Sequence, residues 1–402
     1  MYKLNMREVG YALSEALDYV GIDDVYHGKR VAFMASQLCS MMNYPQEKID
    51  HMINIGMLHD CGVSNTDTHH SLVTELDWDG SQDHCVRGAA LLKKVDCYKA
   101  YSDVILYHHT HWRDLEALDI DESVKINANI ILLVDRVDAL RAQGRTPEEI
   151  RDTLHMQKGK MFNAKLVDLF ALASKPESFW FYLESSNLEQ FLREWISLEN
   201  EREYPYKYIE EIAFMFSSIV DAKSSFTAEH SVKVSQVCIY IAKVLQLPQD
   251  KIEILALAAL LHDLGKLRVE DSILEKKGPL TEDEKKVMDR HGFDSEMILR
   301  KIDGFKEIAL LASSHHETLD GKGYPYHKTK DELNIESRIL MIGDVFQALV
   351  QNRPYRKQLT QAEIMTILYK MDEQGKIDTN ILKVIEDNLE ELYTIADTKK
   401  LF

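Results

Sequence analysis

The chain of 402 residues is too long for one ordinary hydrophobic core, so its length predicts two or three domains. Its 45% apolar and 28% charged residues are typical of a folded globular protein and exclude extensive disorder. A net charge of -18 argues against duplex nucleic acid or an anionic membrane as a partner. The negative net charge does not exclude a small phosphorylated ligand, because metal ions and a few basic side chains can set the electrostatic field inside a pocket.

The start of the chain and its cysteines indicate a cytoplasmic protein. The first 21 residues have no long apolar core with a small-residue cleavage site, and no run of about 18 apolar residues occurs in the chain. The five cysteines (39, 61, 85, 97 and 238) are scattered and form no CxxC pair. We therefore predict reduced thiols, no exported form and no membrane span.

Apolar residues recur at intervals of three and four, prolines are few, and alternating β-branched segments are rare, so we predict an all-α fold. The first candidate ligand set lies between residues 27 and 135. It contains imidazole and carboxylate groups only: His27, His59, Asp60, His84, His108, His109 and Asp135.

The same pattern of spacings occurs again about 200 residues later, which indicates an internal repeat. The segment 44–49 aligns with 247–252 at an offset of 203, and 92–96 aligns with 299–303 at an offset of 207 after a four-residue insertion. A later match pairs 146–150 with 360–364. The equal histidine spacings are 32 residues in His27–His59 and His230–His262, and 24 residues in His84–His108 and His291–His315.

We therefore predict two copies of one helical domain, residues 1–200 and 205–402. Residues 186–220 have a helical pattern broken near Pro205, which predicts a helical spacer between the copies. In the second copy, a helix over 231–245 places Val234, Val237, Ile241 and Val244 on one stripe. The next helix, from about residue 249, carries Ile252, Leu255, Ala259 and His262 on one face, so that it delivers His262 and Asp263 to the core.

The candidate ligands of the second copy are too many for one ion that keeps open positions. They are His230, His262, Asp263, His291, His315, His316 and Asp344. Imidazole and carboxylate without thiolate suit iron, manganese or zinc, and the count predicts two ions bridged by Asp263. A single buried histidine is more often a hydrogen-bonded core residue, but the repeated set argues for ligands.

Beside this set, Gly265-Lys266 and the turn Asp320-Gly321-Lys322-Gly323-Tyr324-Pro325 have the residue types that hold a phosphate. The His-Asp pair with Gly-Lys, the double histidine followed by Glu317, and the Gly-Tyr-Pro turn together resemble the HD-GYP branch of the HD-domain phosphohydrolases. The resemblance runs from about residue 221 to 356. At the glycines of this turn, a tight turn with positive φ is an alternative that is compatible with the functional interpretation.

The resemblance implies a bacterial phosphodiesterase that opens cyclic dinucleotides, chiefly cyclic di-GMP, through a hydroxide bridging two divalent ions, with iron or manganese favoured. It implies that Asp263 and Lys266 are catalytic and that Lys266 stabilises charge on the scissile phosphate. Further substrate contacts on this basis are Lys322, Tyr324, Arg353 and Arg356.

Two positions before His230 differ from the common family pattern. Ser224 stands where the family often has an acid, which leaves 3',3'-cyclic GMP-AMP open as the substrate. Phe226 replaces the extra carboxylate of three-metal members, which favours two ions. Two different functions also fit these motifs: a receptor that binds cyclic dinucleotides without turnover, and a general nucleotide phosphohydrolase.

The first copy keeps the ligand set but lacks the other motif residues. Val63 stands in the place of Lys266, and no Gly-Tyr-Pro turn follows His109. We predict that this copy can bind metal and has a regulatory or structural role, although a different hydrolase or a ligand sensor would fit the same residues. A homodimer is a further possibility.

Overall fold

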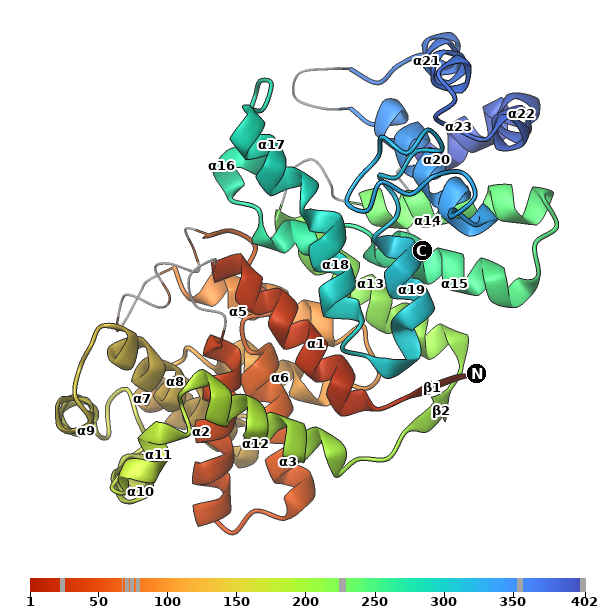
Figure 1. Ribbon diagram of the computed structural model, residues 1–402. Helices are drawn as coiled ribbons and strands as arrows, with labels where there is room; N and C mark the ends of the chain where they lie inside the picture. The colour runs from red at the N-terminus through yellow and green to blue at the C-terminus, as the bar shows by residue number, and fades with distance from the viewer. Residues whose placement is uncertain are drawn as a thin grey trace. The chain divides into compact units, whose positions relative to one another are not determined.

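The computed structural model describes residues 1–21, 26–66, 68, 72, 76, 80–223, 229–352 and 357–397 (Figure 1). Nearly all regular structure in these residues is helical, which confirms the predicted all-α class. Within the same residues the one sheet is a pair of short strands, β1 (Tyr2–Leu4) and β2 (Arg202–Tyr204).

The chain divides into two compact units. The N-terminal unit is Leu4–Arg202, and the C-terminal unit is Met1–Lys3 with Glu203–Phe402. The helices of the N-terminal unit are α1 (Met6–Asp18), α2 (His27–Met41), α3 (Gln46–Leu58), α5 (Gln82–Leu92), α6 (Ser102–Tyr107), α7 (Trp112–Glu116), α8 (Glu122–Ala142), α9 (Pro147–Met156), α10 (Ala164–Ala173), α11 (Glu177–Phe181) and α12 (Ser185–Ser197).

The C-terminal unit repeats the central part of this arrangement. Its elements are α13 (Tyr206–Lys223), α14 (His230–Val244), α15 (Gln249–Leu261), the 3-10 helix η3 (Leu264–Arg268), α16 (Asp271–Leu274), α17 (Glu282–Asp289), α18 (His291–Leu299), η4 (Asp303–Phe305), α19 (Lys306–Ala312), α20 (Ile335–Val350), α21 (Gln361–Glu373), α22 (Thr379–Asp387) and α23 (Leu389–Asp397).

Helices α2 and α3 begin and end at residues equivalent to those of α14 and α15, because the same local signals recur. After α2 the chain takes a left-handed conformation at Asn43, with φ 55°, and after α14 it does so at Gln246, with φ 57°. Such a residue ends a helix and turns the chain. Pro45 and Pro248 are then the N-caps of α3 and α15.

Two details differ from the sequence-based predictions. Val244 is 40% exposed, so the apolar stripe of α14 ends at Ile241, because Val244 is the last residue of the helix. The predicted spacer is two core helices separated by β2. Leu188, Leu192 and Trp195 of α12 are buried in one unit, and Ile209, Ile212 and Phe216 of α13 are buried in the other.

No helix in the described part of the chain is both long enough and apolar enough to cross a membrane.

Candidate metal centres

Helix ends bring the candidate ligands of the C-terminal unit together. Two of them are the first residues of α14 and α18, four follow the ends of α15 and α19 closely, and the last lies inside α20. Their ligand atoms form three overlapping groups, each within 4.8 Å: His230, His262 and Asp344; His262, Asp263 and His315; and His291, His315 and His316. All seven predicted residues therefore lie in one cluster.

Asp263 lies between two sets of imidazoles. Its Oδ2 is 3.2 Å from His262 Nε2 and 3.6 Å from His230 Nε2. Its Oδ1 is 3.5 Å from His291 Nε2 and 3.7 Å from His315 Nε2. Each carboxylate oxygen thus faces a different pair of histidines, which is the arrangement that a carboxylate bridging two ions requires.

Hydrogen bonds at Nδ1 fix the histidines so that Nε2 faces the centre. His262, His291 and His315 each direct Nδ1 to the carbonyl oxygen three residues earlier, at 2.6–2.7 Å. His230 directs Nδ1 to Gln347 Oε1 at 2.6 Å. Such partners set the tautomer and orientation of metal-binding histidines.

The electrostatics of the cluster favour ionised carboxylates and several neutral imidazoles. Burial opposes ionisation of Asp263, but the charges of His262 and Lys266 hold its pKa well below the usual range. Burial lowers the pKa of His291 to about 3 and that of His316 to about 4. Burial also acts on His262, but the adjacent Asp263 charge raises its pKa to about 9.

The donor set fits a divalent metal. His262 Nε2 and Asp263 Oδ1 are buried and make no hydrogen bond. Buried polar atoms are normally satisfied, and cations bound beside His262 Nε2 and beside Asp263 Oδ1 would satisfy them.

The sequence Gly265-Lys266 has a packing role and a charge role. A Cβ at Gly265 would overlap the carbonyl oxygen of His291, so glycine allows η3 to approach α18. Gly265 N also donates to Ser295 Oγ at 2.8 Å. Lys266 Nζ lies 2.6 Å from Asp263 Oδ2, which places the predicted catalytic lysine directly at the cluster.

The Gly-Tyr-Pro turn packs on the ligands. The Tyr324 ring centroid lies 4.7 Å from that of His316, and Tyr324 N donates to His316 O at 3.2 Å. Tyr324 therefore positions a candidate ligand, which the sequence did not reveal. Glu317 anchors the same turn, because its fully buried carboxylate accepts from Tyr326 N at 2.7 Å and from Lys328 N at 2.9 Å.

The two glycines of this turn serve different purposes. Gly321 has φ +71°, as the turn alternative predicts. The positive φ predicted for Gly323 is wrong, since Gly323 is not among the glycines with positive φ. A Cβ there would overlap the Glu317 backbone, so Gly323 permits a close approach.

The structure does not place every predicted substrate contact at the cluster. The Lys322 side chain is 81% exposed and lies 3.5 Å from Asp320. Arg353 and Arg356, like Ser224 and Phe226, lie outside the described residues.

The N-terminal unit assembles an equivalent cluster. His59 and His84 lie 3.4 Å and 3.3 Å from Asp60, each on a different carboxylate oxygen. Asp135 lies 3.4 Å from His27 and 3.8 Å from His109. His108 Nε2 is 3.2 Å from His84 Nε2, so all seven residues predicted for this copy also meet.

Buried basic residues surround this second cluster. Arg136 Nη2 lies 2.8 Å from Asp135, and Arg30 Nε lies 2.6 Å from Asp138, which also contacts His27 Nδ1 at 2.8 Å. Although burial opposes it, Arg136 and His27 hold the pKa of Asp135 well below its usual range. At the equivalent positions of the C-terminal unit stand Val345, Lys233 and Gln347.

Sequence reasoning missed several residues that touch the ligands. Gln347, Asp138, Arg136 and Cys85 contact candidate ligands. An alignment of the two copies would have identified two of these positions, because Gln347 stands where the first copy has Asp138, and Gly292 stands where it has Cys85.

Two helical units, each with a buried cluster of histidines and aspartates, define an HD-domain metal-dependent phosphohydrolase. The HD domain family matches residues 25–140 and 215–381. The chain is 34% identical over 406 residues to the 3'3'-cGAMP-specific phosphodiesterase 1 of Vibrio cholerae, covering 98% of this chain and 94% of that protein. The chain belongs to the HD-GYP family of cyclic dinucleotide phosphodiesterases, which confirms the resemblance seen in the sequence.

Two further comparisons agree with this assignment. The chain is 36% identical over 152 residues to the cyclic di-GMP phosphodiesterase response regulator RpfG of Xanthomonas campestris pv. campestris, covering 37% of this chain and 40% of that protein. A crystal structure of a cyclic GMP-AMP specific phosphodiesterase of V. cholerae has the same fold. Its TM-score is 0.66 at 23% identity, over 97% of this chain and 98% of that one.

Proposed function

We propose that the C-terminal unit opens the ring of 3',3'-cyclic GMP-AMP by hydrolysing one 3'–5' phosphodiester. The observation that carries the proposal is the position of Asp263, whose two oxygens face different histidines while Lys266 contacts one of them. The relative that matches over nearly the whole chain is named for this substrate, which supports the choice of the mixed dinucleotide.

The ligand set divides into two positions that share Asp263. The first is His230, His262 and Asp344, and the second is His291, His315 and His316. The absence of sulfur from these six residues favours iron or manganese. Two such ions, when bound, neutralise the phosphodiester and lower the pKa of a bound water.

Lys266 supplies positive charge at the same place. Its Nζ contacts the Asp263 oxygen that faces His230 and His262, so its ammonium lies next to any phosphate bound at the first position. A fixed cation there stabilises the charge that develops on the phosphate oxygens during cleavage. The Lys266 side chain is 21% exposed, so it is not sealed off from solvent.

The N-terminal unit has a different role in this proposal. Val63 is buried and apolar where the other unit has Lys266, and α7 begins three residues after His109 where the other unit has the Gly-Tyr-Pro turn. Among its described residues, the unit therefore lacks counterparts of the lysine and the turn that would hold and polarise a cyclic dinucleotide. We propose that it binds metal through its own cluster and serves a regulatory or structural purpose.

The test is anaerobic purification of the full chain with metal analysis, followed by incubation with 3',3'-cyclic GMP-AMP and with cyclic di-GMP. We expect a linear product from the mixed dinucleotide, and no product with Asp263→Asn. Asp303→Asn, which changes an exposed carboxylate of the same unit, is the matched control and should retain turnover. Failure of the metal-loaded protein to cleave either substrate would contradict the proposal and favour a receptor.

Cyclic di-GMP is the second candidate substrate. The similarity to RpfG over 152 residues supports it, and a faster reaction with this substrate in the same assay would establish it. The cytoplasmic location and the homodimer stay predictions from the sequence.

A further inference from the structure

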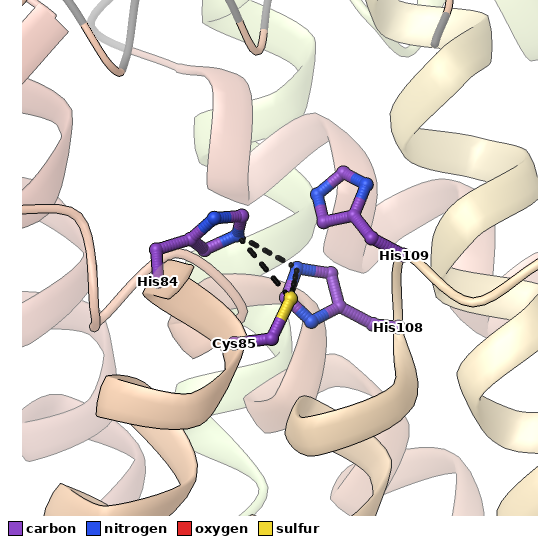
Figure 2. A group of neighbouring side chains, drawn as sticks. All are labelled: His84, Cys85, His108 and His109. Carbon is purple, nitrogen blue, oxygen red and sulfur yellow. Dashed lines mark hydrogen bonds between the residues drawn. The ribbon is translucent and has the colours of Figure 1, made fainter. Parts of the chain in front are cut away.

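A sulfur atom stands among the histidines of the N-terminal cluster. His84 and Cys85 lie in the first turn of α5, and His108 and His109 follow the end of α6. Figure 2 shows the Cys85 sulfur beside the His108 ring, with contacts to both His84 and His108. One ligand atom from each of the four residues lies within 4.8 Å of the others.

The separations suit a shared tetrahedral ion. At Zn–N of about 2.0–2.1 Å and Zn–S of about 2.3 Å, tetrahedral ligands lie about 3.3 Å apart for two nitrogens and about 3.6 Å for nitrogen and sulfur. His84 Nε2 and His108 Nε2 are 3.2 Å apart. Cys85 Sγ is 3.8 Å from the first of these nitrogens and 4.0 Å from the second.

Buried polar atoms without hydrogen bonds point independently to a ligand. His109 Nε2 and Asp60 Oδ1 are both buried and make no hydrogen bond. The Asp60 atom is 3.3 Å from His84 Nε2, so both belong to the surroundings of this group. Buried polar atoms of this kind are rare unless an ion or water completes them.

The sulfur is specific to the N-terminal unit. The residue equivalent to Cys85 is Gly292, and in the described part of the C-terminal unit the corresponding group consists of His291, His315 and His316. A Cβ at Gly292 would already lie 3.1 Å from Ser313 O, so that unit has little space for a thiol.

We propose that the N-terminal unit holds one zinc ion on His84, the Cys85 thiolate, His108 and His109. When the S–Zn bond forms, the thiol loses its proton to solvent and gives up its hydrogen bond to Ser81 O. Three imidazoles and a thiolate select a thiophilic ion and close the tetrahedron, which is typical of structural rather than hydrolytic zinc. The inference deepens the proposal that this unit binds metal without cleaving cyclic dinucleotides, and it rests on that proposal.

Asp60 offers the alternative fourth ligand, so the experiment has to distinguish sulfur from oxygen. Zinc-edge X-ray absorption of the full-length protein should show one sulfur at about 2.3 Å from zinc. Cys85→Ser should remove this signal and lower the zinc content by about one ion per chain. In cobalt-loaded protein the same change should remove the sulfur-to-cobalt charge-transfer band.

Cys39→Ala is the matched control. Cys39 is a fully buried thiol of the same unit outside the ligand group, and the equivalent residue of the other unit is Ala242. This variant should retain the sulfur signal and the zinc. Zinc bound by nitrogen and oxygen alone would overturn the inference but leave metal binding by this unit intact. A wild-type chain with no metal in this unit would overturn both, while loss of cyclic dinucleotide cleavage would bear only on the C-terminal unit.

Discussion

The two clusters keep the same seven ligand types but differ in the charges around them. In the N-terminal unit Arg136 contacts Asp135, and Lys29 Nζ lies 2.5 Å from Asp18. The C-terminal unit has Val345 and Val232 at the two basic positions, while Asp344 and Asp221 remain.

This difference indicates which groups neutralise the buried acids in each unit. Burial raises the pKa of Asp221 to about 7, and this carboxyl lies close enough to Asp263 for their charges to repel. In the N-terminal unit Asp135 is paired with Arg136 and Asp18 with Lys29, although burial still raises the pKa of Asp18 to about 6. Breaking such a buried pair costs about 3–5 kcal/mol. In the C-terminal unit Asp344 and Asp221 lack these two basic neighbours and the lysine contact is at Asp263 instead, an arrangement that suits a centre completed by cations.

The largest expected effect concerns the central carboxylates. Asp263→Ala should lower kcat/KM by at least about 1000-fold and release metal from the C-terminal unit, because both proposed positions share this residue. Asp60→Ala, at the equivalent position, should cost far less turnover because its unit lacks the phosphate-binding groups. Steady-state kinetics with metal analysis measures both, and equal losses would contradict the proposed division of roles.

A substitution of Lys266 in the C-terminal unit should have the next largest effect. Lys266→Met should lower kcat on the order of 10²–10³-fold, because it removes a fixed cation from the phosphate site. Metal content should stay at the wild-type level. Loss of metal instead would show that Lys266 serves mainly to orient Asp263.

Substitution of either of two equivalent glycines, one in each unit, should lower the free energy of unfolding by a similar amount. A Cβ at Gly62 would overlap His84 O, as one at Gly265 would overlap His291 O. Gly62→Ala and Gly265→Ala should each destabilise the protein by about 2–3 kcal/mol through overpacking. Denaturant unfolding measures this, with Gly278→Ala as a control because a Cβ there meets nothing within 4 Å. A neutral result at Gly62 alone would indicate a looser helix contact in the N-terminal unit.

The all-α fold and the clustering of the candidate ligands could be predicted, because both depend on local or repeated patterns. Helix ends follow from Pro45 and Pro248, and equal spacings in two copies identify the histidines. The surrounding contacts could not be predicted, because they join residues far apart in the chain. His230 and Gln347 are separated by 117 positions, and Arg30 and Asp138 by 108. The contact of the Tyr324 ring with His316 could not be predicted either, and the substrate contact at Tyr324 stays a prediction.

We expect the smallest effect from a substitution of Lys322, where the family resemblance and the structure lead to different expectations. The family resemblance implies a substrate contact, but the side chain is mostly exposed and lies near Asp320. Lys322→Ala should therefore change kcat/KM by less than about twofold, because an exposed ion pair of this kind contributes little. Lys286→Ala, with a 76% exposed side chain on α17, is the matched control. A rise in KM of about tenfold for Lys322→Ala alone would mean that the substrate draws this lysine in, and the catalytic unit would then have a second cation that the N-terminal unit lacks.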